Sequence, residues 1–217
     1  MKVILFQGDS ITDTKRSKED LSSFGYGYPT LIKSSMGFDH PGQYSFINKG
    51  IGGNRIVDLY ARIKVDIINL KPDVVSILIG VNDVWAELSD DCNGVDADKY
   101  YKLYCMLVEE IRESLPGVQI MILEPFVLKG ISTETKWETF RGEVYLRAEK
   151  ARAVAEKYGF VFVPLQEKFN EAEQVCPARL WLWDGVHPTN MGHELIKREW
   201  IKAFRRLEEI TGERNKA

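Results

Sequence analysis

The sequence is poor in cysteine: of its 217 residues only Cys92, Cys105 and Cys176 carry a thiol. Three cysteines cannot all pair within one chain and none belongs to a Cys-x-x-Cys motif, which argues against a disulfide framework and a thiolate metal site. Long apolar runs are also missing. The run that follows Lys2 ends at Gln7, short of the ~7–15 residues of an export signal. We therefore expect a cytoplasmic protein that has no membrane partner.

A strong charge of one sign is likewise absent. The chain has 29 Lys and Arg against 32 Asp and Glu, a formal net charge of -3. Its densest basic stretch, residues 197–206, alternates with apolar residues, as the solvated face of a helix does. This pattern disfavours electrostatic capture of nucleic acid, and no nucleic-acid partner is expected.

Short, β-branched apolar runs alternate along the chain with longer amphipathic segments. Strands that are apolar throughout indicate a sheet covered on both faces, and strand–helix alternation requires parallel, right-handed crossovers. We predict an α/β fold, a three-layer αβα sandwich with about five parallel strands, as a single domain over residues 1–217. The expected strands are Val3–Phe6, Tyr44–Ile47, Val74–Ile79, Val118–Leu123 and Phe160–Val163, and the expected helices are Tyr28–Met36, Ile56–Leu70, Asp98–Ser114, Trp137–Tyr158 and Met191–Ile210.

Glycines and short polar residues gather where the expected strands end. In open parallel sheets, ligands bind beyond the carboxyl ends of the strands. A functional site is therefore expected among four segments: residues 8–10, 50–54, 80–83 and 124–126.

Ser10 follows the first expected strand, and the preceding Gly8 permits a tight turn. A serine hydroxyl is a weak nucleophile until a base takes its proton, so a histidine would have to lie within reach. A capping role for Asp9 or Ser10 at the next helical turn fits the position equally well. The motif Gly-x-Ser-x-Gly does not occur, which disfavours the α/β-hydrolase layout.

Histidine is scarce, so the candidate bases are His40, His187 and His193. The first precedes Pro-Gly and belongs to a surface turn, and the third lies within the last helix, where we expect a structural role. His187 stands between Val186 and Pro188, and proline biases the residue before it toward an extended backbone.

Asp184 precedes His187 by three residues in the same loop. Its carboxylate can accept the imidazole Nδ1–H and leave Nε2 free for Ser10, which is the orienting role of the third member of a catalytic triad. A surface Asp–His pair that caps the following helix is the alternative interpretation.

Ester hydrolysis also needs hydrogen-bond donors directed at the developing oxyanion, each typically worth ~2.7–4 kcal/mol of barrier. The backbone N–H of Ser10, the backbone N–H of Gly53 and the side-chain amide of Asn82 are the candidates. The pair Gly52-Gly53 could instead be a flexible turn, and Asn82 could form an Asx-turn.

Four blocks together resemble the SGNH (GDSL) hydrolase family, in the family's order and over nearly the whole chain. The resemblance implies a flavodoxin-like sheet, with Ser10 as nucleophile, His187 as general base and then acid, and Asp184 as the residue that orients the histidine. The blocks are Gly8-Asp9-Ser10-Ile11-Thr12, Gly52-Gly53, Gly80-x-Asn82-Asp83 and Asp184-x-x-His187-Pro188.

The resemblance further implies that Gly53 and Asn82 complete an oxyanion hole with Ser10. The family often has Ser-Gly where this chain has Gly52-Gly53, so either glycine could donate, and Gly53 is preferred. No cofactor or metal ion is implied.

A narrower resemblance connects the chain with the intracellular acetylxylan esterase branch of that family. It implies removal of small acyl groups, acetyl above all, from short xylooligosaccharides or related glycans, and a possible homo-oligomer, since some members assemble into rings. The segments that carry it are Asn48–Ile51, Lys71–Asp73, Ile79–Trp85 and Trp183–Pro188.

Two tryptophans flank the expected site: Trp85 lies just beyond Asn82, and Trp183 immediately precedes Asp184. If they face the cleft, they could stack on a sugar ring, although packing of the loops is an equally good interpretation. The candidate lid is the segment 126–137, whose mixed polarity fits a polar substrate better than a long lipid chain.

Three alternatives remain open at this level. A lysophospholipase or thioesterase would use the same residues on longer acyl chains. A metal-dependent phosphoesterase could cluster Asp9, Asp83 and Asp184 near His187. A catalytically inactive carbohydrate-binding protein could share the fold, because fold does not guarantee function.

Overall fold

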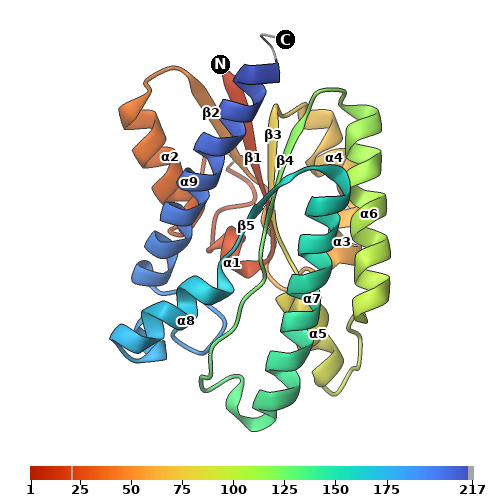
Figure 1. Ribbon diagram of the computed structural model, residues 1–217, viewed down its shortest axis with the longest axis vertical. Coiled ribbons are helices and arrows are strands. Elements are labelled where there is room, and N and C mark those ends of the chain that lie inside the picture. Colours follow the sequence, from red (N-terminus) through yellow and green to blue (C-terminus); the bar gives the residue numbers. More distant parts are fainter. Residues whose placement is uncertain (21, 215–217) are drawn as a thin grey trace.

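The computed structural model describes residues 1–20 and 22–214, which form a central parallel sheet covered by helices (Figure 1). Its five strands run in the order β2-β1-β3-β4-β5, the order of flavodoxin-like folds. The predicted α/β sandwich is therefore confirmed. The strands are β1 (Lys2–Gly8), β2 (Tyr44–Asn48), β3 (Val74–Leu78), β4 (Gln119–Leu123) and β5 (Val161–Val163).

The helices cover both faces of the sheet (Figure 1). Helices α2 and α9 pack on each other over one face, and α6 packs against α3 and α7 over the other. The helices are α1 (Ser10–Asp13), α2 (Tyr28–Asp39), α3 (Ile56–Ala61), α4 (Ile63–Asp66), α5 (Val81–Leu88), α6 (Ala97–Ser114), α7 (Trp137–Tyr158), α8 (Gln166–Val175) and α9 (Asn190–Arg214), with 3₁₀ turns η1 (Ile68–Leu70), η2 (Glu134–Lys136) and η3 (Ala178–Leu180).

Consecutive residues of β1 serve two different cores. Ile4 and Phe6 belong to the cluster beneath α2 and α9, whereas Leu5 belongs to the cluster beneath α3 and α6. Side chains alternate between the faces of a strand, so a strand with helices on both sides carries apolar residues on both of its faces. This explains why the strands could be recognised as continuous apolar runs.

The single helix expected over residues 56–70 is wrong, because the chain is broken there into α3, α4 and η1. The first break is at Arg62, whose guanidinium turns inward and donates to the carbonyl of Lys49 and the side chains of Gln7 and Asp66. Apolar residues keep the helical spacing across the break, so periodicity alone did not reveal it.

Two helices were not predicted. Helix α5 carries Asn82 and Asp83. The residue before it, Gly80, has φ 138°, a conformation that glycine adopts readily and residues with a side chain rarely adopt. Helix α8 lies near the end of β5 and is capped by Glu124, whose carboxylate accepts the backbone N–H groups of Leu165 and Gln166.

The strand register brings the segments with functional potential to one edge. Gly8 pairs with Leu78, and Leu78 pairs with Leu123, so β1, β3 and β4 end together. This is the lower edge of the sheet in Figure 1, where α1 and α5 begin. Within the described ranges, none of the helices has the length and apolar character needed to cross a membrane.

Trp200 provides a test of the core beneath α9. It is fully buried, stacks on Phe204 and donates its indole N–H to Ser76 Oγ at 2.9 Å. Trp200→Ala is expected to lower the free energy of unfolding by about 3–5 kcal/mol, measured by urea denaturation. Trp183→Ala is the matched control and should cost less than about 1 kcal/mol, because Trp183 is 54% exposed. Equal costs would contradict this assignment of the core.

Candidate active site

Ser10 is the first residue of α1, directly beyond the end of β1. Asp9 caps this short helix by accepting the Ile11 N–H at 2.9 Å. A side chain at residue 8 would meet the Leu78 carbonyl at 2.3 Å, so only glycine lets the strand turn here. The Ser10 hydroxyl is thereby held at the carboxyl edge of the sheet.

A loop near the C-terminus meets Ser10. His187 Nε2 lies 3.0 Å from Ser10 Oγ, and His187 Nδ1 lies 2.8 Å from Asp184 Oδ2. The other carboxylate oxygen of Asp184 accepts the backbone N–H groups of Val186 and His187, at 2.9 and 2.8 Å. The loop is closed by the pairing of Leu182 with Pro188. The structure thus brings the three residues expected from the sequence into one hydrogen-bonded chain.

The Asp184–His187 pair has opposite effects on the two titrating groups. The hydrogen bond that His187 donates to the Asp184 carboxylate raises the pKa of His187 above its ordinary value, although partial burial acts against it. Burial acts to raise the pKa of Asp184, but the hydrogen bonds from His187 and Val186 outweigh it and lower that pKa. The Asp184 carboxylate is therefore ionised. It favours the tautomer with the proton on Nδ1, in which Nε2 is free to accept the proton of Ser10.

Two glycines lie beside Ser10, and they differ in what their N–H groups do. Gly52 donates to Asp13 Oδ2 at 3.0 Å. Gly53 has φ 82°, and its N–H has no hydrogen-bond acceptor within the described chain. Asn82, in the first turn of α5, donates one amide hydrogen to the Asn54 carbonyl at 3.1 Å and keeps the other.

Each aspartate of the phosphoesterase alternative is engaged with a different backbone segment. Asp9 caps α1, Asp83 accepts the Ile56 N–H that begins α3, and Asp184 holds its own loop. Burial raises the pKa of Asp9 to about 7 and that of Asp83 to about 8. Residues 1–20 and 22–214 contain no group of three or more His, Cys, Asp or Glu arranged to hold a metal ion.

A pocket of about 330 Å³ opens at Ser10 and His187. Trp183 lines it and stacks on the His187 ring, with centroids 5.7 Å apart and planes at 20°. Trp85 is half-buried against His187 and Phe140 and is not part of the described lining. Sequence reasoning missed another part of the lining, Asp13, Thr14, Lys15 and Tyr26, because none of these residues belongs to a recognisable motif.

The segment 126–137, considered above as a lid, is packed against the Asp184 loop instead. Leu128 N–H donates to the Gly185 carbonyl at 2.9 Å, and Ser132 N–H donates to the Asp184 carbonyl at 3.0 Å. A side chain at Gly130 would lie 2.5 Å from the backbone of Asp184. This segment therefore supports the loop that carries His187.

The other two histidines lie outside this hydrogen-bonded chain. His193 is buried in α9, and its Nδ1 accepts the backbone N–H of Tyr28 at 3.2 Å. Burial, assisted by the nearby charge of His187, lowers the pKa of His193 to about 4. His40 is exposed at the end of α2.

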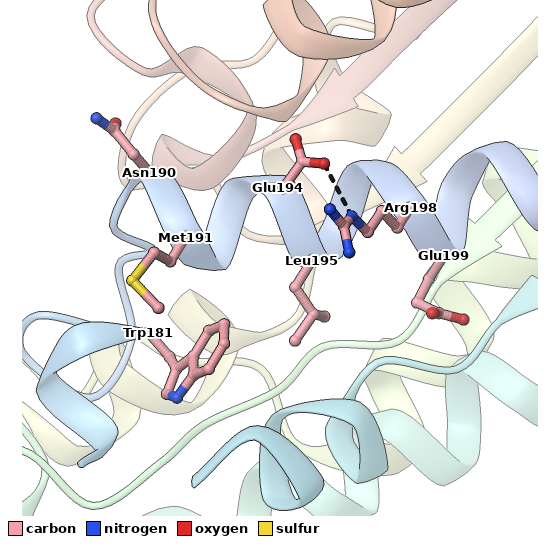
Figure 2. Close-up of a pocket in the computed structure, with 7 residues that line it drawn as sticks. All are labelled: Trp181, Asn190, Met191, Glu194, Leu195, Arg198 and Glu199. Carbon is pink, nitrogen blue, oxygen red and sulfur yellow. Dashed lines mark hydrogen bonds and ion pairs between the residues drawn. The ribbon is translucent and has the colours of Figure 1, made fainter. Parts of the chain in front are cut away.

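A larger pocket, of about 470 Å³, lies on the outer side of α9 (Figure 2). Figure 2 shows the Trp181 indole beside Met191 and Leu195, with an ion pair between Glu194 and Arg198 along the rim. Neither Ser10 nor His187 is part of its lining. Its size therefore does not make it the reacting site.

Residues 6–195 match the model of the GDSL-like Lipase/Acylhydrolase family. The chain is 34% identical over 208 residues to an acetylxylan esterase of Geobacillus stearothermophilus, and the match covers 92% of each.

Solved structures give the same result. Axe2, an acetylxylan esterase from Geobacillus stearothermophilus, matches with a TM-score of 0.84 at 30% identity over 93% of each chain. Matched structures of Axe2 include catalytic mutants in which an aspartate or a serine is replaced by alanine.

LAE5, an alpha/beta hydrolase enzyme from the metagenome of Lake Arreo, matches with a TM-score of 0.82 at 29% identity, covering 93% of this chain and 94% of that one. The chain therefore belongs to the GDSL-like lipase/acylhydrolase family and is a carboxylic-ester hydrolase.

Proposed function

We propose that the chain hydrolyses short-chain acyl esters, with O-acetyl groups on xylooligosaccharides or related glycans as substrate, through a Ser10–His187–Asp184 triad. The observation that carries the proposal is the pair of hydrogen bonds centred on His187, 3.0 Å to Ser10 Oγ and 2.8 Å to Asp184 Oδ2. A nucleophile, a base and an orienting carboxylate in this order are the requirements of acyl transfer.

The reaction begins as His187 Nε2 takes the proton of Ser10 while Oγ attacks the ester carbonyl. The negative charge that develops on the carbonyl oxygen is stabilised by the N–H groups of Ser10 and Gly53 and by the free amide hydrogen of Asn82. His187 then protonates the departing alcohol, leaving an acyl group on Ser10. Water, deprotonated by His187, attacks this acyl-enzyme and releases the acid, which restores the hydroxyl.

The pocket supports a small acyl group on a polar alcohol. Its volume is about 330 Å³, and it presents the exposed indole of Trp183 beside the reacting groups, with Lys15 and Tyr26 also in its lining. An aromatic face stacks well on a sugar ring, and the polar residues suit its hydroxyl groups. The similarity to acetylxylan esterases supports the same substrate class.

Removal of either reacting side chain is the first test. Ser10→Ala and His187→Ala should each reduce kcat/KM for 4-nitrophenyl acetate by about 10⁴-fold or more, with little change in Tm, because each deletes a member of the triad. Asp184→Asn should be milder, by about 10²–10⁴-fold. The controls are Ser35→Ala and His40→Ala, which lie on α2 and at its end. Activity that survives in Ser10→Ala would refute the mechanism.

The pH dependence tests the coupling of Asp184 to His187. The base must be neutral, so kcat/KM should rise with pH through the His187 pKa, which the Asp184 hydrogen bond places above the ordinary value of about 6.5. Asp184→Asn removes that stabilisation of the imidazolium and should shift the acid limb to lower pH, while the rate falls. NMR titration of the imidazoles should show His193 at about 4. An acid limb that does not move in Asp184→Asn would contradict the assignment.

Acyl-chain length distinguishes an acetyl esterase from a lipolytic enzyme. Nitrophenyl acetate should be hydrolysed faster than nitrophenyl octanoate, because a pocket of about 330 Å³ must also hold the alcohol. Acetate release from acetylated xylooligosaccharides, measured on a panel with other acetylated glycans, identifies the acceptor. A rate that increases steadily with chain length would favour the lysophospholipase or thioesterase alternative.

A further inference from the structure

The turn that carries Gly53 is held by side chains on both sides of it. On the α5 side, Asn82 donates to the Asn54 carbonyl at 3.1 Å. On the α1 side, Asp13 Oδ2 accepts the Gly52 N–H at 3.0 Å. Gly53 lies between these two attachments.

Asp13 is an unusual residue to find in this position. It is buried at the end of α1, one helical turn beyond Ser10. Its second oxygen, Oδ1, is buried and has no hydrogen-bond partner among the residues that the structure describes. A buried polar atom without a partner lowers the stability of the fold. The hydrogen bond from the Gly52 N–H to Asp13 therefore calls for an explanation in terms of function.

The neighbouring Arg16 does not satisfy the free oxygen of Asp13 with a hydrogen bond. Arg16 Nε lies 3.9 Å from Asp13 Oδ1, beyond hydrogen-bond distance. Its guanidinium is committed to the Gly50 carbonyl, to which Nε and Nη2 donate at 3.1 and 3.0 Å. Arg16 and Asp13 therefore hold the same turn by two different backbone groups, a carbonyl at Gly50 and an N–H at Gly52.

Direct packing transmits this attachment to the reacting serine. A Cβ on Gly50 would lie 2.4 Å from the Asp13 backbone nitrogen, so the turn and α1 touch with no side chain between them. A Cβ on Gly52 would lie 3.7 Å from Ser10 Cβ. The turn is thus held both to the end of β1, where the Ile51 N–H donates to the Gly8 carbonyl at 3.1 Å, and to α1, where Asp13 makes the polar contact at Gly52.

We infer that Asp13 is a positioning residue for the oxyanion site: by binding the Gly52 N–H it fixes the glycine turn and leaves the Gly53 N–H directed at the developing charge. The inference rests on the proposed function, in which Gly53 is a donor. Two adjacent glycines give a backbone that can rotate freely, and an acceptor on one of them selects a single arrangement. Asp13 itself does not touch the reacting atoms.

Asp13→Ala should therefore lower kcat for 4-nitrophenyl acetate by about 10–100-fold while KM stays within about threefold, because a misplaced donor affects the transition state more than the bound ester. The Ki of phenylboronic acid, which forms a tetrahedral adduct with Ser10, should rise by a similar factor. Asp13→Asn keeps an oxygen that can accept the Gly52 N–H, and should restore kcat to within about threefold of the wild type.

Asp96→Ala is the control, since the Asp96 carboxylate also accepts backbone N–H groups, those of Asp98 and Lys99, at the start of α6 and away from the turn. It should lower Tm and leave kcat within about threefold of the wild type. If Asp13→Ala does not fold, Asp13→Ser, whose hydroxyl is one atom shorter than the carboxylate, serves instead.

Wild-type kcat in a folded Asp13→Ala protein would overturn the inference, as would a loss that Asp13→Asn shares in full or one confined to KM. A wild-type protein without esterase activity would instead refute the proposed function, so the two failures are distinguishable.

Discussion

The hydrogen bond between Ser10 and His187 joins residues 177 positions apart, and most of the architecture serves to make it possible. Ser10 is positioned by the end of β1, and His187 is positioned by a loop near the C-terminus that folds back to the same edge of the sheet. The loop is held on three sides, by the Asp184 carboxylate from within, by the pairing of Leu182 with Pro188, and by the segment after β4.

The same edge of the sheet gathers carboxyl groups in a place that disfavours their charged form. Asp9 and Asp83 are buried, and desolvation raises the pKa of each. Both carboxyl groups accept backbone N–H groups at the start of a helix, so they order the segments that carry Ser10 and the glycine turn. Burial of these carboxyl groups lowers the stability of the fold, but their hydrogen bonds fix the geometry of the site. This is common where a reaction requires preorganised groups.

The sequence was informative about the fold because its strands are mostly apolar, and the sheet is where it was predicted to within about a residue at most strand ends. It was less informative where tertiary contacts override local pattern. Arg62 breaks a helix by reaching toward Gln7 and Lys49, and no spacing rule anticipates that contact.

The candidate site was easier to predict because the sequence has only three histidines, so the loop that contains Asp184 and His187 could be singled out. The structure brings these residues to Ser10, and their roles remain proposals. What the sequence could not reveal was the set of groups that hold the glycine turn and the Asp184 loop. The Asp13 carboxylate binds the Gly52 backbone N–H, and Gly130 and Ser132 contact the backbone of the Asp184 loop. Contacts to backbone atoms leave no residue-type signature.

The segment after β4 limits how the binding site of this enzyme can diversify. Because residues 126–137 hold the Asp184 loop through hydrogen bonds and a close glycine contact, they cannot lengthen into a mobile cover without releasing the histidine. Lys15 and Tyr26 line the pocket and take no part in these contacts with the Asp184 loop, so new substrate preferences are expected to arise at such positions. The groups that hold the histidine are thus separate from the residues at which the pocket can adapt to its substrate.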